Sequence, residues 1–389
     1  MKARQIIDNI LIFLLIGISG MPFFLEYEII ILSLLNAVFF IFIFTRQLSI
    51  KKYYLFFLIL FLLFSIIQYY IQGQYLLRTT MGIIARINTA YFIFTYTKDR
   101  FSDVFVRQMV ILSIISLVYS GLHLLSPGSY NFLMNLSFVD STFSLNNNII
   151  YTFSKAYRNS GPFWESGAFS GFLIISLLIY HRNFKSFSFF DKTDLVLFIS
   201  IITTFSTSGY LAFMIFYLVL FINTSTINKV VKFLFLPILF GAFGYIFFVT
   251  DFMNEKISNQ WEYSLDYNSG QSKFVNTRFV VLMKDYDQFI RKPFFGWGYD
   301  NNTRIEILST HFASITNGTS DFLVRYGIIG FLVFVIGLYY SYRRFGFSIK
   351  YSIFSIFLLF FIAFSENYFR YTFFWGLPLL SYIPEKLNE

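Results

Sequence analysis

The sequence reads KPFFGWG at 292–298 and TNGTSD at 316–321, inside a polar segment, 251–321, that separates long apolar runs. Connecting segments of this length are uncommon in compact proteins, and they are usually functional or disordered. This segment contains aromatic residues, among them Trp261 and Trp297, which disordered linkers tend to lack. The pattern therefore predicts a folded loop that carries the chemistry of the protein.

The composition around this loop is typical of an integral membrane protein. Of the 389 residues, 56% are hydrophobic and 13% are charged, so polar side chains are too few to cover a water-soluble globule. The formal net charge of +9 does not predict nucleic-acid binding, because Lys and Arg lie in short clusters between apolar runs. The absence of Cys excludes disulfides and thiolate chemistry.

Apolar runs of spanning length predict an all-α polytopic fold of about 12 transmembrane helices in a single membrane domain, residues 1–389. The predicted spans are 6–24, 28–45, 53–71, 81–97, 104–125, 165–181, 193–206, 209–223, 230–250, 321–341, 350–365 and 371–384. Only Ser206–Gly209 separates the seventh span from the eighth, so one long helix is the alternative there. The first span follows Met1–Arg4 with no small-residue cleavage site, and it is expected to be retained.

The distribution of Lys and Arg between short loops predicts the orientation. One side collects sixteen of them: Lys2, Arg4, Arg46, Lys51, Lys52, Lys98, Arg100, Arg182, Lys185, Lys192, Lys229, Lys232, Arg343, Arg344, Lys350 and Lys386. The short loops of the other side hold only Arg78 and Arg370. Both termini are therefore expected in the cytoplasm, and the long loops 126–164 and 251–320 outside. Merging spans seven and eight would break this pattern, which favours two helices.

The motif RNSGPFWESG at 158–167 supplies the first candidate groups. Arg158 offers a fork of donors suited to phosphate, and Glu165 is a candidate proton acceptor near the outer membrane boundary. The alternative for Glu165 is structural, because a carboxylate at the start of a helix is favoured by the helix dipole.

Further Arg residues lie at membrane depth or at the predicted outer surface. Arg86 and Arg325 fall inside predicted spans, where a charge requires a partner or a wet cavity. Asp321 can pair with Arg325 and Glu366 with Arg370, because each pair has i,i+4 spacing.

The long loop supplies Arg278, which begins a stretch expected to be a surface helix near the membrane plane. It also supplies His311, although a lone His is more often a surface residue than a catalyst. Three loop carboxylates, Asp285, Asp287 and Asp300, match no calcium or zinc signature, so no metal is predicted.

Together these motifs resemble the O-antigen polymerases of the Wzy type, within the wider superfamily that includes the O-antigen ligases. The likeness lies in RNSGPFWESG at 158–167, TFSTSGY at 204–210, Arg278 followed by PFFGWG at 293–298, Asn317-Gly318, and YGIIG at 326–330. It covers about 150–335. Ser166 stands where the family commonly has Pro, and Thr316-Asn317 stands where the ligases have His-Asn, which favours a polymerase and leaves the general base open.

The resemblance implies a C-type, metal-independent, inverting glycosyltransferase without a cofactor. It would join undecaprenyl-pyrophosphate-linked oligosaccharide repeats into an O-antigen- or capsule-like polysaccharide on the outer face of the bacterial cytoplasmic (inner) membrane. The candidate catalytic residues are Glu165 or His311 as base, with Arg158 and Arg278. The expected pyrophosphate ligands are Arg86, Arg158, Arg278 and Arg325, and the expected glycan-binding residues are Trp164, Trp297 and Asn317. Membrane lipid and a separate chain-length regulator are candidate partners.

Three other functions are compatible with the same predicted spans and loops. An O-antigen ligase-type glycosyltransferase would use the same loops. A lipid-linked oligosaccharide flippase or other transporter would also have many spans, but transporters more often carry related halves and charges near the midplane. A non-catalytic assembly factor is the remaining alternative. The sequence identifies neither the sugar nor the linkage.

Overall fold

The computed structural model describes residues 2–72, 77–141, 143–153, 158–182, 191–223, 278–298 and 317–382, with Gly241, Ser258, Asn259 and Glu262. His311 and, apart from Gly241, the predicted span at 230–250 lie outside these described residues.

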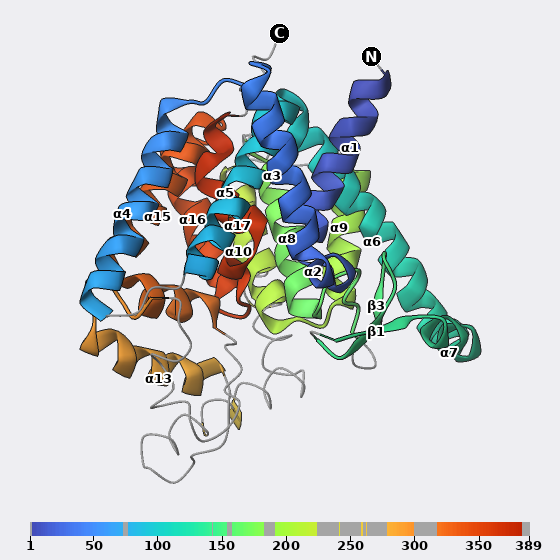
Figure 1. Ribbon diagram of the computed structural model, residues 1–389. Coiled ribbons are helices and arrows are strands. Elements are labelled where there is room, and N and C mark those ends of the chain that lie inside the picture. The colour runs from blue at the N-terminus through green and yellow to red at the C-terminus, as the bar shows by residue number, and fades with distance from the viewer. Residues whose placement is uncertain are drawn as a thin grey trace.

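A bundle of apolar α-helices makes up most of the described chain (Figure 1). The bundle helices are α1 (Lys2–Gly17), α3 (Glu28–Phe44), α4 (Lys52–Gln72), α5 (Leu77–Thr97), α6 (Phe101–Leu125), α8 (Ser166–Tyr180), α9 (Lys192–Thr203), α10 (Thr207–Asn223), α15 (Gly318–Arg344) and α16 (Ile349–Ala363). Shorter elements are α2 (Pro22–Glu26), η1 (Lys98–Arg100), α7 (Pro127–Asn135), α13 (Arg278–Arg291), η3 (Tyr368–Arg370), α17 (Thr372–Gly376) and η4 (Leu377–Tyr382).

Among the described residues, three stretches are long and apolar enough to cross a membrane, by length and composition: Lys52–Ile71, Arg78–Leu125 and Gly318–Arg344. Four shorter apolar helices accompany them: Glu28–Phe44, Ser166–Tyr180, Thr207–Asn223 and Ile349–Ala363. The helical architecture expected of a membrane protein is therefore confirmed, whereas the count of about 12 spans stays a prediction.

Backbone breaks divide several apolar runs. Lys98, with φ of 50°, separates α5 from α6, and Phe205, with φ of 47°, separates α9 from α10. The structure thus has two helices where the sequence left one long helix as an alternative.

Two of the predicted spans are interrupted in the structure. The run at 6–24 is α1 followed by α2, which has Pro22 in its first turn, and the run at 371–384 is α17 followed by the 3₁₀ turns of η4. Pro378 lies at the second position of η4, and a proline lacks the backbone N–H that a continuing α-helix needs.

The all-α prediction missed a small sheet in the loop 126–164. Strands β1 (Phe138–Asp140), β2 (Leu145–Asn147) and β3 (Thr152–Phe153) are antiparallel in the order β1-β2-β3. They are too short to give a periodic sequence signal. The N–H of Thr152 donates to the carbonyl of Gly161 at 2.7 Å, and that of Trp164 to Gly20 at 3.2 Å. The first bond joins β3 to the end of the same loop, and the second attaches the loop to the turn between α1 and α2.

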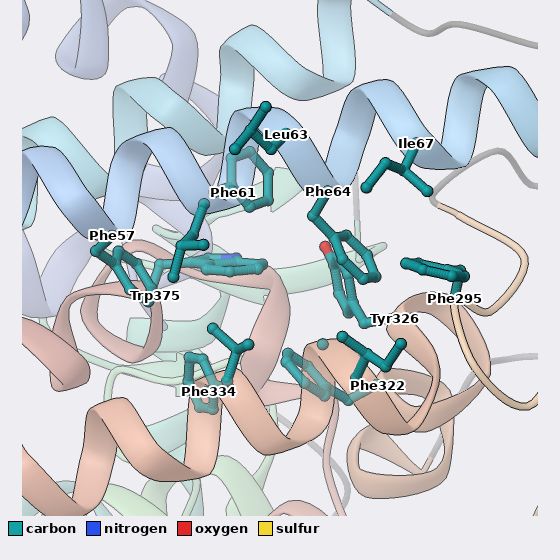
Figure 2. Close-up of a pocket in the computed structure, with 14 residues that line it drawn as sticks. Phe57, Phe61, Leu63, Phe64, Ile67, Phe295, Phe322, Tyr326, Phe334 and Trp375 are labelled. Atoms are coloured by element: carbon teal, nitrogen blue, oxygen red, sulfur yellow. The ribbon is translucent and has the colours of Figure 1, made fainter.

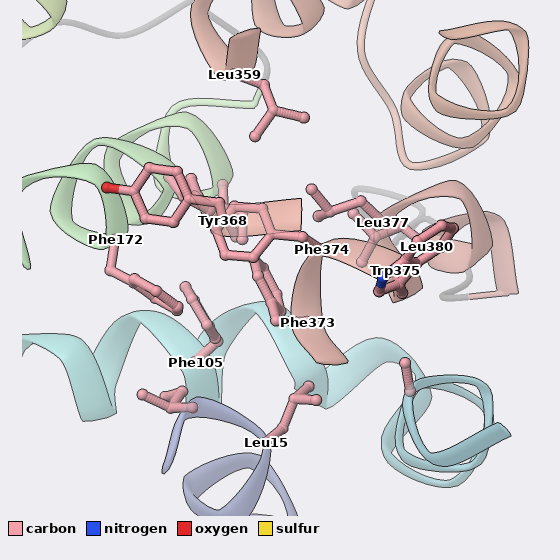
Figure 3. Close-up of a cluster of buried hydrophobic side chains, with 14 of the residues drawn as sticks. Leu15, Phe105, Phe172, Leu359, Tyr368, Phe373, Phe374, Trp375, Leu377 and Leu380 are labelled. Carbon is pink, nitrogen blue, oxygen red and sulfur yellow. The ribbon is translucent and has the colours of Figure 1, made fainter. Parts of the chain in front are cut away.

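The core of the bundle is built largely from aromatic rings. Figure 3 shows Phe105, Phe172, Tyr368, Phe373 and Phe374 gathered where α6, α8 and the chain after α16 meet. Phe105 and Phe373 stack with centroids 5.3 Å apart, and Phe172 meets Phe374 edge-on at 5.6 Å. Each such pair contributes about 0.5–1.5 kcal/mol beyond burial. Packing of this kind is the main attraction between helices in lipid, where apolar surface alone is not expelled.

Helix α13 lies across one end of the bundle, the same end as α7 and the sheet, and α1 begins at the opposite end (Figure 1). The surface helix predicted from Arg278 onward is thus present. It packs against α15.

A kink in α15 joins this end of the bundle to the KPFFGWG turn. Gly327 has φ of 61° and ψ of −173°, which interrupts the helix. The N–H groups of Trp297 and Gly298 donate to the carbonyls of Val324 and Arg325 at 2.8 and 2.9 Å. In return, the N–H of Ile328 donates to the Pro293 carbonyl at 2.8 Å. The backbone groups freed by the kink are therefore satisfied by the turn, as buried backbone groups require.

Gly327→Ala is expected to destabilise the fold by about 1–3 kcal/mol, because its backbone conformation is one that essentially only Gly adopts. An added Cβ would also overlap the Phe294 carbonyl. Unfolding of the purified protein in lipid nanodiscs measures the change. Gly121→Ala is the control, because nothing lies within 4 Å of the position of its Cβ. Equal stability of the Gly327→Ala and wild-type proteins would contradict the expectation.

Candidate active site

Three distant segments converge on Glu366, which follows the end of α16. Arg278, the first residue of α13, donates from Nη2 to Glu366 Oε1 at 3.1 Å and from Nε to the Ser365 carbonyl at 2.9 Å. The indole Nε1 of Trp164 donates to Glu366 Oε2 at 3.3 Å. Glu165, the residue after Trp164, is near enough to act electrostatically on the Glu366 carboxyl. The structure thus brings together Trp164, Glu165 and Arg278, which the sequence predicted as site residues.

Local backbone geometry makes this meeting possible. Glu165 is the N-cap of α8 in an extended conformation, φ −153° and ψ 154°, and Gly167 is the second helical residue. A Cβ on Gly167 would overlap Glu366 Oε1, so only Gly lets the carboxyl approach α8 this closely. The hydroxyl of Tyr368 donates to the Gly167 carbonyl at 2.9 Å, which fixes the chain beyond Glu366 on the same helix.

The two carboxyl groups differ in their surroundings. Glu366 is 5% exposed, whereas Glu165 is exposed to solvent. Burial and the neighbouring Glu165 carboxylate raise the pKa of Glu366 to about 8, against the opposing effect of the Arg278 guanidinium. The surroundings of Glu366 therefore disfavour the charged form of its carboxyl group.

Aromatic rings surround the exposed side of this cluster. The half-buried Trp164 ring lies 4.8 Å from Tyr371 and stacks with Phe143 at 6.3 Å, centroid to centroid. Aromatic faces beside charged groups suit the binding of sugar rings, which is the role that the sequence predicted for Trp164.

Arg158 lies at a second position, beside the break between α9 and α10. It interacts electrostatically with Tyr210 of α10. The next residue, Asn159, is anchored there because its backbone N–H donates to the Thr203 carbonyl at 3.0 Å and its side chain to Thr203 Oγ1 at 2.9 Å. This packing joins two of the motifs, RNSGPFWESG and TFSTSGY.

The other predicted pyrophosphate ligands have acidic partners. Arg86 of α5 makes a bidentate pair with Glu28 of α3, at 2.8 and 2.7 Å. Arg325, 1% exposed, donates from Nε to both carboxylate oxygens of Asp321, at 2.9 and 2.8 Å. Both pairs satisfy the partner requirement that the sequence raised for a charge within a span, and the ligand roles of these residues stay predictions.

Two predicted glycan-binding residues also have local roles. The side chain of Asn317 caps α15 by accepting from the N–H of Ser320 at 3.1 Å. The Trp297 indole donates to the Gln288 carbonyl at 2.8 Å, and Lys292 Nζ lies 4.1 Å from the centre of its ring. Asn317 therefore starts α15, whereas Trp297 joins the turn at 292–298 to both α13 and α15.

Metal ligands do not gather in the part of the chain that the structure describes, where no three His, Asp or Glu form a group. Asp285 is buried and accepts from Ser320 Oγ at 2.6 Å. Asp300 and the candidate base His311 lie outside the described residues.

Glu366 is the residue that sequence reasoning misjudged. Its spacing from Arg370 suggested an i,i+4 ion pair, but α16 ends at Ala363 and the two residues do not share an α-helix. The sequence contained a signal for a different partner. The helix dipole disfavours a carboxylate just beyond the C-terminal end of a helix, so such a carboxylate requires a nearby cation. In the structure that cation is the guanidinium of Arg278.

An apolar pocket of about 240 Å³ lies between α4 and α15 (Figure 2). Phe57, Phe61 and Phe64 of α4 face Phe322, Tyr326 and Phe334 of α15, with Trp375 and Phe295 at its edges. Phe295 belongs to the same turn that satisfies the kink in α15, so the pocket adjoins the end of the bundle that carries α13.

The O-antigen ligase family model matches residues 193–335 of this chain. The match includes α9, α10, Arg278 and the first half of α15, but it does not extend to Glu165 or Glu366. The comparisons with curated proteins and with solved structures gave no match.

With the apolar helices, the family match supports a bacterial membrane protein of the O-antigen ligase and polymerase superfamily. That superfamily suggests a glycosyltransferase-like enzyme that acts on a lipid-linked oligosaccharide in the membrane.

Asp321→Ala is expected to destabilise the protein by about 3–5 kcal/mol, because it leaves the buried Arg325 guanidinium without the carboxylate that it contacts. The double variant Asp321→Ala/Arg325→Leu is expected to regain a large part of that loss, because it removes the buried charge as well. Unfolding free energies in nanodiscs check both values. A mild effect of Asp321→Ala would show that the pair contributes little to folding.

Proposed function

We propose that this protein polymerises undecaprenyl-pyrophosphate-linked oligosaccharide repeats into a surface polysaccharide on the outer face of the bacterial cytoplasmic membrane. The observation that carries the proposal is the meeting of Arg278, Glu165 and Trp164 at one end of an apolar bundle. An anion-binding group, a carboxylate and an aromatic ring are what glycosyl transfer from a lipid pyrophosphate requires there.

In the proposed reaction, a hydroxyl oxygen of the incoming repeat bonds to the anomeric carbon of the growing chain. Its proton passes to a base, and the bond between the anomeric carbon and the phosphate oxygen breaks, with its electron pair leaving on undecaprenyl pyrophosphate. A single displacement of this kind inverts the anomeric centre. Glu165 is the favoured base because its carboxylate is exposed beside Arg278, and His311 is the alternative.

Arg278 has the donors that a pyrophosphate needs. A guanidinium has five N–H donors. Within the described part of the chain, two of them bond to Ser365 and Glu366, so three are left. The side chain is 22% exposed, so these donors can reach a substrate. Charge-assisted bonds from Arg to phosphate oxygens would strengthen as the leaving group gains charge.

The expected position of the protein in the membrane supports the same proposed function. Helix α13 crosses the end of the bundle where the sequence places the outer surface, and the pocket between α4 and α15 has the apolar lining that part of a prenyl chain would need. Both termini would then be cytoplasmic. A separate chain-length regulator is a candidate partner of such a polymerase.

A polymerase is favoured over a ligase because Thr316 stands where the ligases have the His of their His-Asn pair. The purified protein, given only synthetic lipid-linked repeat, should make a ladder of polymers. Transfer that occurs only when a lipid A-core acceptor is added would support the ligase instead. Release or flipping of the repeat without a new glycosidic bond would support a transporter.

Arg278→Ala is expected to lower polymer formation by at least about 10²-fold, because it removes charge stabilisation of the leaving group. Arg278→Lys should recover only part of the activity, since an ammonium lacks the bidentate fork. Arg291→Ala, at the exposed far end of the same helix, is the matched control and should stay near wild type. Polymer made by Arg278→Ala at the control rate would remove Arg278 from the mechanism.

Polymer formation by the purified protein is expected to survive EDTA, because cationic side chains would supply the charge that a metal supplies elsewhere. The rate before and after chelation measures this directly. Loss of activity that Mg²⁺ or Mn²⁺ restores would contradict the expectation, and it would redirect attention to Asp285, Asp287 and Asp300.

A further inference from the structure

Another cavity, of about 420 Å³, lies among the described residues at the end of the bundle away from the Arg278 cluster. It is bounded by the first turns of α6, the last residues of α8 and the first turn of α9, three helices that pack against one another. Helix α8 begins beside Glu366 and runs for 15 residues, about 22 Å, before it reaches this cavity. The cavity is therefore separate from the candidate active site.

Hydrogen-bond donors line the cavity near the ends of the three helices. They are two guanidinium groups and two hydroxyl groups, those of Arg107, Arg182, Ser102 and Thr193. Arg182 donates from Nη1 to Ser102 Oγ at 3.3 Å, and its guanidinium carbon lies 5.6 Å from the centre of the Phe345 ring. Arg107 donates from Nη2 to Asn9 Oδ1 of α1 at 2.6 Å. Both hydrogen bonds go to uncharged partners, so they position the guanidinium groups without cancelling their charge.

The junction of α8 and α9 is braced beside these donors. His181 Nε2 lies 2.8 and 2.9 Å from the two carboxylate oxygens of Asp194, and both residues are buried. The hydroxyl of Tyr180 donates to the carboxylate of Asp191, which also caps α9 by accepting from the N–H of Thr193 at 3.1 Å. The two helix ends that contribute to the cavity are thus held together before any ligand arrives.

The rest of the lining is largely apolar. Val106, Val110 and Ile111 follow Ser102 on one face of α6, at spacings of about one turn, and Ile179 faces them from α8. The cavity therefore changes from polar at the helix ends to apolar toward the middle of the bundle. Its volume is within the usual range of ligand sites. A lining of this kind suits an amphiphile with an anionic head and a hydrocarbon chain.

We propose that this cavity binds one anionic phospholipid, with its phosphate on Arg107 and Arg182 and the start of an acyl chain against Val110 and Ile179. The proposed site is independent of the proposed function.

Charge and location favour this occupant. The two guanidinium groups outnumber Asp103, the one carboxylate among the described lining residues, so positive charge remains for a phosphodiester. Arg forms charge-assisted and often bidentate bonds to phosphate oxygens. The sequence places this end of the bundle in the cytoplasm, and basic pockets between helices on that side of a membrane bind lipid headgroups. A soluble phosphate would leave the apolar part of the lining without a partner.

Native mass spectrometry of the purified protein with added lipid tests the site. The wild type should retain one phosphatidylglycerol at least about tenfold more tightly than phosphatidylcholine, whose headgroup has no net charge. Arg107→Gln/Arg182→Gln should bring the two lipids close to equality. Arg344→Gln is the matched control and should keep the preference, because it removes an exposed charge beside Phe345 that does not line the cavity.

Competition with glycerol phosphate distinguishes a lipid from a free phosphate. This probe carries the phosphate without the acyl chains, so at equal concentration it should leave bound phosphatidylglycerol in place. Displacement of the lipid would assign the cavity to a soluble phosphate and overturn the proposal.

Thermal stability gives a second readout in nanodiscs. Replacing phosphatidylcholine by phosphatidylglycerol should raise the melting temperature of the wild type and of Arg344→Gln, because a ligand that binds only the folded state stabilises it. The rise should be absent in the double variant. Equal retention of the two lipids by the wild type, or an unchanged preference in the double variant, would overturn the site. If the double variant does not fold, Arg107→Gln decides, because this side chain is exposed and its loss should still lower the preference. Neither readout involves glycosyl transfer, so failure of the proposed function would leave the lipid site standing.

Discussion

The contact of Arg278 with the end of α16 is the interaction on which the candidate site depends. One guanidinium bonds to a freed helix-terminal carbonyl, Ser365, and to the adjacent carboxyl, Glu366, and so attaches α13 to the bundle at a fixed place. Through Trp164 the same carboxyl reaches the start of α8. Within the described part of the chain these two acceptors take two of the five N–H donors of the guanidinium, so this structural contact is compatible with the substrate-binding role proposed for Arg278.

The kink at Gly327 interrupts the hydrogen bonding of an apolar helix. The turn after α13 supplies N–H groups from Trp297 and Gly298 to the carbonyls that the kink releases. Gln68 of α4 adds a side-chain donor to the carbonyls of Phe295 and Arg325, at 2.6 and 2.7 Å. The turn, α4 and α15 are thereby held as one unit around the apolar pocket, and α13, which leads into that turn, is placed by the same bonds. The YGIIG and KPFFGWG motifs, 326–330 and 292–298, are two halves of one hydrogen-bonded structure.

Local signals were enough to predict much of this fold. Apolar runs predicted most of the described helices, since length and hydropathy act within one segment, and the stretch after Arg278 predicted α13. The failures were of two kinds. The strands at 138–153 are too short to show an alternating hydrophobic pattern. Pro22 and Pro378 divide apolar runs that look continuous by hydropathy alone. The pairing of Glu366 was out of reach for a different reason: Trp164 and Arg278 lie 202 and 88 residues away, so tertiary packing alone decides the contact.

The three residues of the Glu165-Ser166-Gly167 motif have different structural roles. Ser166 is the first residue of α8, and at that position a proline would lose no intrahelical hydrogen bond. Ser166 and the Pro expected from the sequence resemblance are therefore both compatible with the start of this helix. Gly167 is different in kind, because any Cβ there would displace the Glu366 carboxyl. Glu165 differs again, as the exposed member of the carboxyl pair. Helix initiation therefore explains Ser166, the approach of the Glu366 side chain explains Gly167, and charge explains Glu165. Only Gly167 and Glu165 bear on the candidate site.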